Sequence, residues 1–89
     1  MITEDTSPET SSTYPESPTF GMKAVGINFN PSGDQDVNRC KMQSANLIDQ
    51  MNGIRNRTES QEQKRLCSIA ITEIQSAQMW AVKAITWKD

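Results

Sequence analysis

The sequence has no histidine, only two cysteines and few aromatic residues, and each shortage excludes a class of protein. Without histidine, the commonest general base of enzymes is missing. Cys40 and Cys67 are not spaced like zinc ligands, so no metal site is expected. Aromatic residues make up 6% and apolar residues 35% of the 89 residues, which is low for an independent globule. A chain this small and polar is therefore expected to need partners to bury its apolar surface.

Long apolar runs are also absent. No segment approaches the roughly 18 to 20 apolar residues that span a membrane, and the N-terminus lacks the basic and apolar pattern of a signal peptide. The sequence thus predicts a soluble intracellular protein with no membrane partner. In the hairpin predicted below, Cys40 and Cys67 would lie roughly 13 Å apart along the axis. That separation exceeds the reach of a disulfide, so both cysteines are expected to be buried thiols.

Basic residues are missing from one end of the chain. Residues 1–19 hold four acidic residues and no Lys or Arg. The remainder holds all nine Lys and Arg against seven Asp and Glu, so its formal charge is +2, although the whole chain has −2. This charge is too weak for general binding to duplex DNA, which uses many phosphate contacts. It suits a small anionic ligand held by a few cations.

The composition divides the chain into two parts. Ser, Thr, Pro and Glu dominate the N-terminal part, which has little apolar surface to offset the entropy lost on ordering. We therefore predict a disordered acidic tail over residues 1–17 and a helical domain over residues 18–89. Tyr14 is the one aromatic residue of the tail, and it is a candidate contact with a neighbouring subunit.

Apolar spacing and capping residues predict an all-α fold. Residues 20–26 predict a short N-terminal helix. A second helix should begin at Asp34 or Ser32, either of which can serve as N-cap, and end near Arg57. A third should begin near Ser60, which forms an S-x-x-Q capping box with Gln63, although Thr58 and Gln61 offer a second register, and it should run close to the C-terminus. The short connection between the two long helices makes them an antiparallel hairpin.

Two further features of the sequence are a turn before the second helix and a glycine inside that helix. The preceding segment of residues 30–33, NPSG, predicts a turn. Such a turn is either a nest for a phosphate or simply the entry to the helix. Gly53 lies inside the helix, where it costs about 1 kcal/mol relative to alanine. We expect it to allow the close approach of another backbone.

The third helix has apolar residues on two sides, both at a spacing of three or four residues. The first stripe consists of Leu66, Ile69, Ala70, Ala77, Trp80, Ala81, Ala84 and Trp87. The second stripe consists of Cys67, Ile71, Ile74, Val82 and Ile85. A surface helix needs only one such stripe. We expect the second helix to pack on the first stripe and the second stripe to contact other subunits of a homo-oligomer.

Cations near aromatic residues are the candidate binding groups. Phe20 and Lys23 lie on the short first helix, and Lys41 lies at the edge of the hairpin seam. Lys83 lies beside Trp80 on a helix that is otherwise apolar. An aromatic ring can stack on a base while an ammonium group meets a phosphate, so these residues are suited to a nucleotide. For Lys83 the alternative is that its stem covers apolar surface and its ammonium reaches solvent.

Three segments resemble the phage anti-CBASS cyclic-nucleotide sponges. They are TFGMKAVGINFNPSGD, then VNRCK at the opening of a helix, then SIAITEIQSAQMWAVKAITW at the end of the chain. These sponges share a hairpin domain with the Thoeris-antagonist sponges. The resemblance covers residues 18–89, and its most specific part is the C-terminal segment.

This resemblance implies a homohexamer of helical hairpins that acts in the cytoplasm of the infected bacterial host. Members of the family bind cyclic dinucleotides and cyclic trinucleotides, for example cGAMP and cyclic tri-adenylate, without cleaving them. They thereby block CBASS anti-phage signalling. The resemblance implies no cofactor.

Two kinds of pocket are implied by the resemblance. Cyclic dinucleotides bind between two subunits, and the residues of that pocket map onto Phe20 and Lys41, with Lys23 as a further cation and Tyr14 as a competing aromatic residue. Cyclic trinucleotides bind where three subunits meet, and the residues of that pocket map onto Lys83, Arg39 and Gln43.

Two other functions stay open from the residues alone. One is a helical-hairpin interaction module that docks on a host protein through the second stripe. The other is a small phosphodiesterase, which the shortage of catalytic groups makes the weakest hypothesis.

Overall fold

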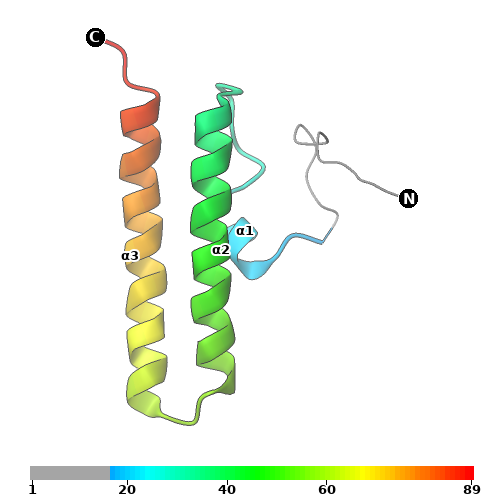
Figure 1. The fold of residues 1–89 in the computed structure, drawn as a ribbon, viewed down its shortest axis with the longest axis vertical. Helices are drawn as coiled ribbons and strands as arrows, with labels where there is room; N and C mark the ends of the chain where they lie inside the picture. The colour runs from blue at the N-terminus through cyan, green and yellow to red at the C-terminus, as the bar shows by residue number, and fades with distance from the viewer. Residues whose placement is uncertain (1–16) are drawn as a thin grey trace.

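The structure is a computed structural model that describes residues 17–89, and every regular element in that range is a helix. The helices are α1 at Phe20–Ala24, α2 at Gln35–Arg57 and α3 at Gln61–Ile85. Figure 1 shows α2 and α3 side by side and antiparallel, with α1 against the middle of α2. The predicted all-α hairpin is confirmed. Within the predicted tail, residues 1–16, Tyr14 included, lie outside the described residues.

Polar side chains fix where the two long helices begin. Asp34 is the N-cap of α2, and its carboxylate accepts a hydrogen bond from the backbone N–H of Asp36 at 2.7 Å. Ser60 caps α3 and accepts from the backbone N–H of Gln63 at 3.1 Å. The other half of the predicted capping box does not form, because the side-chain oxygen of Gln63 accepts from the hydroxyl of Thr58. The backbone N–H of Ser60 donates to that same hydroxyl at 3.2 Å.

The backbone of α1 lies directly on α2. Gly21 is buried there, and a Cβ atom on it would lie 2.8 Å from the carbonyl carbon of Ala45 and closer still to its oxygen. The N–H of Gly21 donates to the carboxylate of Asp49 at 2.6 Å. Inside the chain, the close approach that was expected at Gly53 is therefore found at Gly21. A Cβ on Gly53 would meet only the side chain of Arg57, at 3.4 Å.

The core lies where the end of α1 meets both long helices. Its buried members are Val25, Ala45, Ile48 and Ile71. The side-chain amide of Gln75 on α3 donates to the carbonyl of Ala24 at 3.4 Å, which ties the end of α1 to α3. The short N-terminal segment thus adds a third apolar surface to the hairpin.

The expected roles of the two apolar stripes of α3 are reversed. Of the second stripe, Cys67 and Ile71 are buried and Ile74 packs against the core; we call these three residues the inner side of α3. The large members of the first stripe are exposed by 44 to 68%, whereas its small members Ala77 and Ala81 line a groove shared with α2. We call these large residues the outer side, namely Leu66, Ile69 and Trp80 on α3 and Trp87 just after its end. The prediction was wrong because it gave α3 only α2 as a partner, whereas the segment around Val25 covers the inner side.

Three further features concern cysteines, metals and membranes. Both cysteines are unbridged, Cys67 buried and Cys40 partly so. Among residues 17–89, His, Cys, Asp and Glu do not gather into any group of three that could hold a metal ion. Within the same range, no helix combines the length and the apolarity needed to cross a membrane.

Candidate functional site

Lys41 is a buried cation beneath the segment that connects α1 to α2. Only 6% of this residue is exposed. Its ammonium donates to the carbonyl of Gly26 at 3.0 Å and to the carbonyl of Phe29. The nitrogen lies 5.5 Å from the centroid of the Phe29 ring, which is within the range of a cation–π contact. Burial lowers the pKa of Lys41 from its usual 10.5, because the charged form loses water.

The backbone of the segment between α1 and α2 directs two carbonyls, those of Gly26 and Phe29, toward the ammonium of Lys41. Gly26 and Gly33 have φ of 63° and 68°, a region that glycine enters at little cost. The N–H of Phe29 donates to the carbonyl of Gly26 at 2.8 Å, and the N–H of Gly33 donates to that of Asn30 at 3.1 Å. The side chain of Phe29 remains 71% exposed. The segment therefore holds the cation on one side and presents an aromatic ring to solvent on the other.

The polar groups of the NPSG turn, residues 30–33, form hydrogen bonds with one another and with Asp34. The hydroxyl of Ser32 donates to the side-chain oxygen of Asn30 at 2.8 Å and accepts from the N–H of Asp34 at 3.1 Å. The side-chain amide of Asn30 donates to the carbonyl of Asp34 at 3.0 Å. Since these groups are engaged in positioning the N-cap of α2, the geometry favours a helix entry over a phosphate nest.

The structure does not pair Lys41 with Phe20. The ring of Phe20 contacts the guanidinium of Arg55, with 5.6 Å between the Cζ atom and the ring centroid. Lys41 and Arg55 lie 14 residues apart on α2, about 21 Å along the helix axis. The aromatic residue that meets Lys41 is Phe29, which the sequence analysis did not single out. The feature of the sequence that could have identified Phe29 is that a large aromatic side chain stands in an otherwise polar turn segment.

The residues predicted for the trinucleotide pocket lie at one end of the hairpin. Lys83 is exposed late in α3, and its ammonium lies 5.4 Å from the ring centroid of Trp80. Arg39 and Gln43 are exposed early in α2, where Arg39 pairs with Asp36 at 3.9 Å. Because α2 and α3 are antiparallel, these segments are neighbours (Figure 1). Within residues 17–89, however, no hydrogen bond or ion pair joins the three predicted residues.

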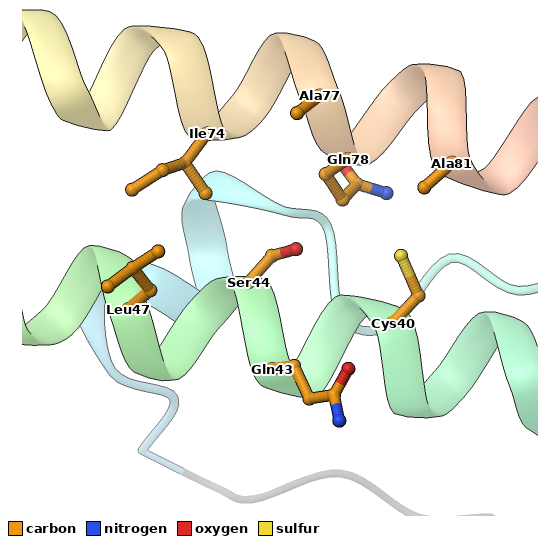
Figure 2. A pocket seen from close by; sticks show the side chains of 8 residues that line it. All are labelled: Cys40, Gln43, Ser44, Leu47, Ile74, Ala77, Gln78 and Ala81. Carbon is orange, nitrogen blue, oxygen red and sulfur yellow. The ribbon is translucent and has the colours of Figure 1, made fainter.

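A shallow groove of about 300 Å³ lies between α2 and α3 near this end. Leu47, Ile74 and Ala77 provide apolar walls, and Figure 2 shows the side chain of Gln78 between the two helices. Gln78 is only 7% exposed. Gln43 lies at the edge of the groove, and its side chain extends away from α3 in Figure 2.

Arg55 links all three helices at the other end of α2. One terminal nitrogen donates to the hydroxyl of Ser68 on α3 at 3.0 Å, and the other donates to the side-chain oxygen of Asn52 at 2.7 Å. The guanidinium also covers part of the ring of Phe20 on α1. Arg55 was not predicted as a site residue, because nothing in the local sequence pattern shows that three helices converge on it.

The fold and its cations define a class: a small all-α hairpin domain in which Lys or Arg side chains lie against aromatic rings at three places. A family model described as "Acb2/Tad1, hairpin domain" matches residues 22–86, so the chain belongs to this family, that of the anti-CBASS and anti-Thoeris sponges. The resemblance found in the sequence is thereby confirmed. No curated protein and no solved structure matches the chain. The family is one of binding domains that sequester immune signals.

Proposed function

We propose that the chain binds cyclic dinucleotide and cyclic trinucleotide immune signals, such as cGAMP and cyclic tri-adenylate, and sequesters them without cleaving them. The observation that carries this proposal is the family match over residues 22–86. Acting in the cytoplasm of the infected bacterial host, the protein would lower the free concentration of the signal and so block CBASS signalling. A sponge of this kind needs tight binding and slow release.

Lys41 and Phe29 are the residues that we assign to the dinucleotide pocket. Two carbonyls, both neutral acceptors, take two of the three N–H groups of the ammonium, so a phosphate oxygen can replace either of them. No carboxylate lies within 4 Å of Lys41 in the described part of the chain. Its charge is therefore uncompensated and little screened, which strengthens its attraction to an anion. The exposed ring of Phe29 offers a face on which a base can stack.

Access to Lys41 requires a local movement. Since 6% of the residue is exposed, a phosphate reaches the ammonium only if the segment of residues 26–33 shifts and gives up one of the two carbonyl contacts. The phosphate then replaces a neutral acceptor with a charged one, and charge-assisted hydrogen bonds are about twice as strong as neutral ones. The roles predicted for Lys23, which is exposed on α1, and for Tyr14 stay predictions, while Phe20 belongs with Arg55.

We assign the trinucleotide pocket to Lys83, Arg39 and Gln43 contributed by several subunits. One chain alone does not bring these side chains into contact, so this pocket needs neighbouring copies. The outer side of α3 supports such an assembly, because it exposes large apolar residues that a monomer would leave in water. We propose a homohexamer, with closed symmetry and equivalent pockets.

Thermal unfolding with and without cGAMP or cyclic tri-adenylate tests the proposal. A ligand at 100 times its Kd that binds only the folded form stabilises it by about 2.7 kcal/mol. We expect both ligands to raise the Tm of the unchanged protein. Phe29→Leu should abolish the shift with cGAMP alone, Lys83→Ala the shift with cyclic tri-adenylate alone, and Lys88→Ala, which removes another exposed lysine, should change neither. Unchanged Tm with both ligands would refute the proposal.

A second candidate function rests on the outer side of α3. Exposed Leu66, Ile69, Trp80 and Trp87 also suit a module that docks on a host protein. This alternative predicts a monomer in sedimentation, no response to nucleotides, and loss of partner binding in Ile69→Asp. The sponge predicts an oligomer that Ile69→Asp dissociates.

A further inference from the structure

Arg55 is a partly buried guanidinium whose charge no carboxylate balances among residues 17–89. Its two hydrogen-bond partners, Ser68 and Asn52, are neutral. These bonds use two of the five N–H groups of the side chain and fix the orientation of its plane, which leaves three N–H groups for another acceptor. A fixed planar cation of this kind is suited to phosphate recognition.

An aromatic ring is held against this cation. The guanidinium lies 5.6 Å from the centroid of the Phe20 ring, and 45% of Phe20 remains exposed. The position of the ring is fixed by its neighbours: Thr19 caps α1, and the N–H of Gly21 donates to Asp49 at 2.6 Å. Stacking surface and charge are thus preorganised by contacts from all three helices.

A second cation, Lys64, lies close to the backbone of Arg55. The ammonium of Lys64 donates to the backbone carbonyl of Arg55 at 3.1 Å. Residues 52–68, which include the hairpin turn, hold four Lys and Arg against two Glu. One of those acids, Glu62, is already bonded to Arg65 at 2.6 Å. When Asp49 beside Gly21 is included, residues 49–68 still hold four Lys and Arg against three acidic residues, an excess of positive charge that favours an anionic ligand.

We propose that Phe20 and Arg55 form a second nucleotide-binding site, in which a base stacks on Phe20 and a phosphate accepts hydrogen bonds from the remaining N–H groups of Arg55. The site lies about 21 Å along α2 from Lys41 and shares no residue with the pockets assigned to Lys41 and Lys83. It therefore does not depend on the function proposed for those pockets. Its ligand class is a phosphate-bearing nucleotide, either cyclic or a 5′-mononucleotide.

Titration calorimetry on the full chain tests this site in a background of Phe29→Leu and Lys83→Ala, which disables the other two pockets. The probes are 5′-AMP, cyclic tri-adenylate and cGAMP, with inorganic phosphate as competitor. We expect at least one nucleotide to bind the background protein. Phe20→Leu and Arg55→Gln should each weaken that binding about tenfold, the loss expected for a stacked ring or a charged hydrogen bond.

Arg57→Gln is the matched control, because it removes an exposed arginine two residues further along α2 and leaves Arg55 and its hydrogen-bond partners in place. It should change nucleotide affinity less than twofold. Arg55→Lys keeps the charge and one donor group while removing the planar fork, so it tests the site if Arg55→Gln does not fold. Like Arg55→Gln, it should weaken binding, because a single ammonium cannot replace the fork.

Three results would overturn the proposal: no nucleotide binds the background protein, the Phe20 and Arg55 variants bind as tightly as their parent, or inorganic phosphate competes as well as 5′-AMP. The last result would mean that the ring contributes nothing. The function proposed for Lys41 fails by a different measurement, namely an unchanged cGAMP response in Phe29→Leu, so the two failures are distinguishable.

Discussion

The inner and outer sides of α3 lie on the same helix but have opposite relations to the rest of the chain. The inner side is covered by α2 and by the segment around Val25, and Ile71 is only 6% exposed. The outer side faces solvent, and Trp80 is 68% exposed. A single chain thus covers its own core but leaves the outer side of α3 exposed. Exposed apolar surface of this kind is typical of a contact with another molecule, which is why we propose an assembly.

The two lysines differ in the same way. Lys41 is buried beneath the connecting segment, and two carbonyls and an aromatic ring are supplied by its own chain. Lys83 is exposed, and its aromatic contact is Trp80, one turn away on the same helix. In our proposal, the groups that contact Lys41 therefore come largely from one subunit, while the pocket at Lys83 takes side chains from several.

The greatest loss in the free energy of unfolding should follow from displacing α1, which covers the core. Gly21→Ala places a Cβ against the backbone of Ala45, so α1 must move away from α2 and uncover the core. We expect a loss of about 3 kcal/mol in the free energy of unfolding. Gly53→Ala is the matched control, since its Cβ meets only a flexible side chain, and it should gain about 0.5 to 1 kcal/mol. Urea unfolding measures both, and equal effects would contradict the docking of α1.

Ile69 and Ile71 lie two residues apart on opposite sides of α3, so substituting each in turn tests the assignment of the inner and outer sides. Ile71→Ala removes a buried side chain of the inner side and should cost about 2 to 3 kcal/mol. Ile69→Ala removes an outer-side residue that is 44% exposed, so it should cost under about 1 kcal/mol within one chain. It should weaken self-association instead, as measured by sedimentation. A larger unfolding loss for Ile69→Ala would reverse the assignment of the two sides.

The burial of Lys41 should change how the free energy of unfolding depends on pH. Because burial lowers the pKa of Lys41 below the 10.5 of the unfolded chain, the unfolded state binds more protons between those two pKa values. Stability should therefore gain a contribution from Lys41 as the pH rises through that window, with a slope of at most about 1.4 kcal/mol per pH unit. Lys41→Met should remove this contribution. Identical alkaline profiles in urea unfolding would show that Lys41 is as hydrated as in the unfolded chain.

The smallest stability effect is expected at the exposed lysine. Lys83→Ala removes a cation–π contact between neighbours on one exposed helix surface, so the free energy of unfolding should change by less than about 0.5 kcal/mol. Any loss of cyclic tri-adenylate binding in this variant would then reflect the pocket and not the fold. Thermal unfolding without ligand provides the check, and a large drop in Tm would instead make Lys83 a structural residue.

Local signals in the sequence predicted the helices well. The N-caps Asp34 and Ser60 place the starts of α2 and α3 where capping chemistry demands. The hairpin follows from the three residues between Arg57 and Gln61. Such signals depend on neighbours in the chain, so a single sequence contains them.

Long-range contacts were harder to predict. The two stripes of α3 have the same period, and periodicity alone does not say which one meets α2. The choice was settled by α1, which docks through Gly21 and brings Val25 onto the core. The pairs Lys41–Phe29 and Phe20–Arg55 could not be predicted for the same reason. Each joins residues that are distant in the sequence, and the docking of α1 and the path of the segment after it decide which of them meet.

The most direct test of sequestration is to follow one ligand through binding and release. Purified protein is incubated with cGAMP, the free ligand is separated by ultrafiltration, and the protein is then denatured and the released ligand analysed by mass spectrometry. We predict that free cGAMP falls in proportion to the protein added, that denaturation returns all of it intact, and that Phe29→Leu leaves most of it free. Ligand that stays free with the unchanged protein, or that returns in a cleaved form, would contradict the account.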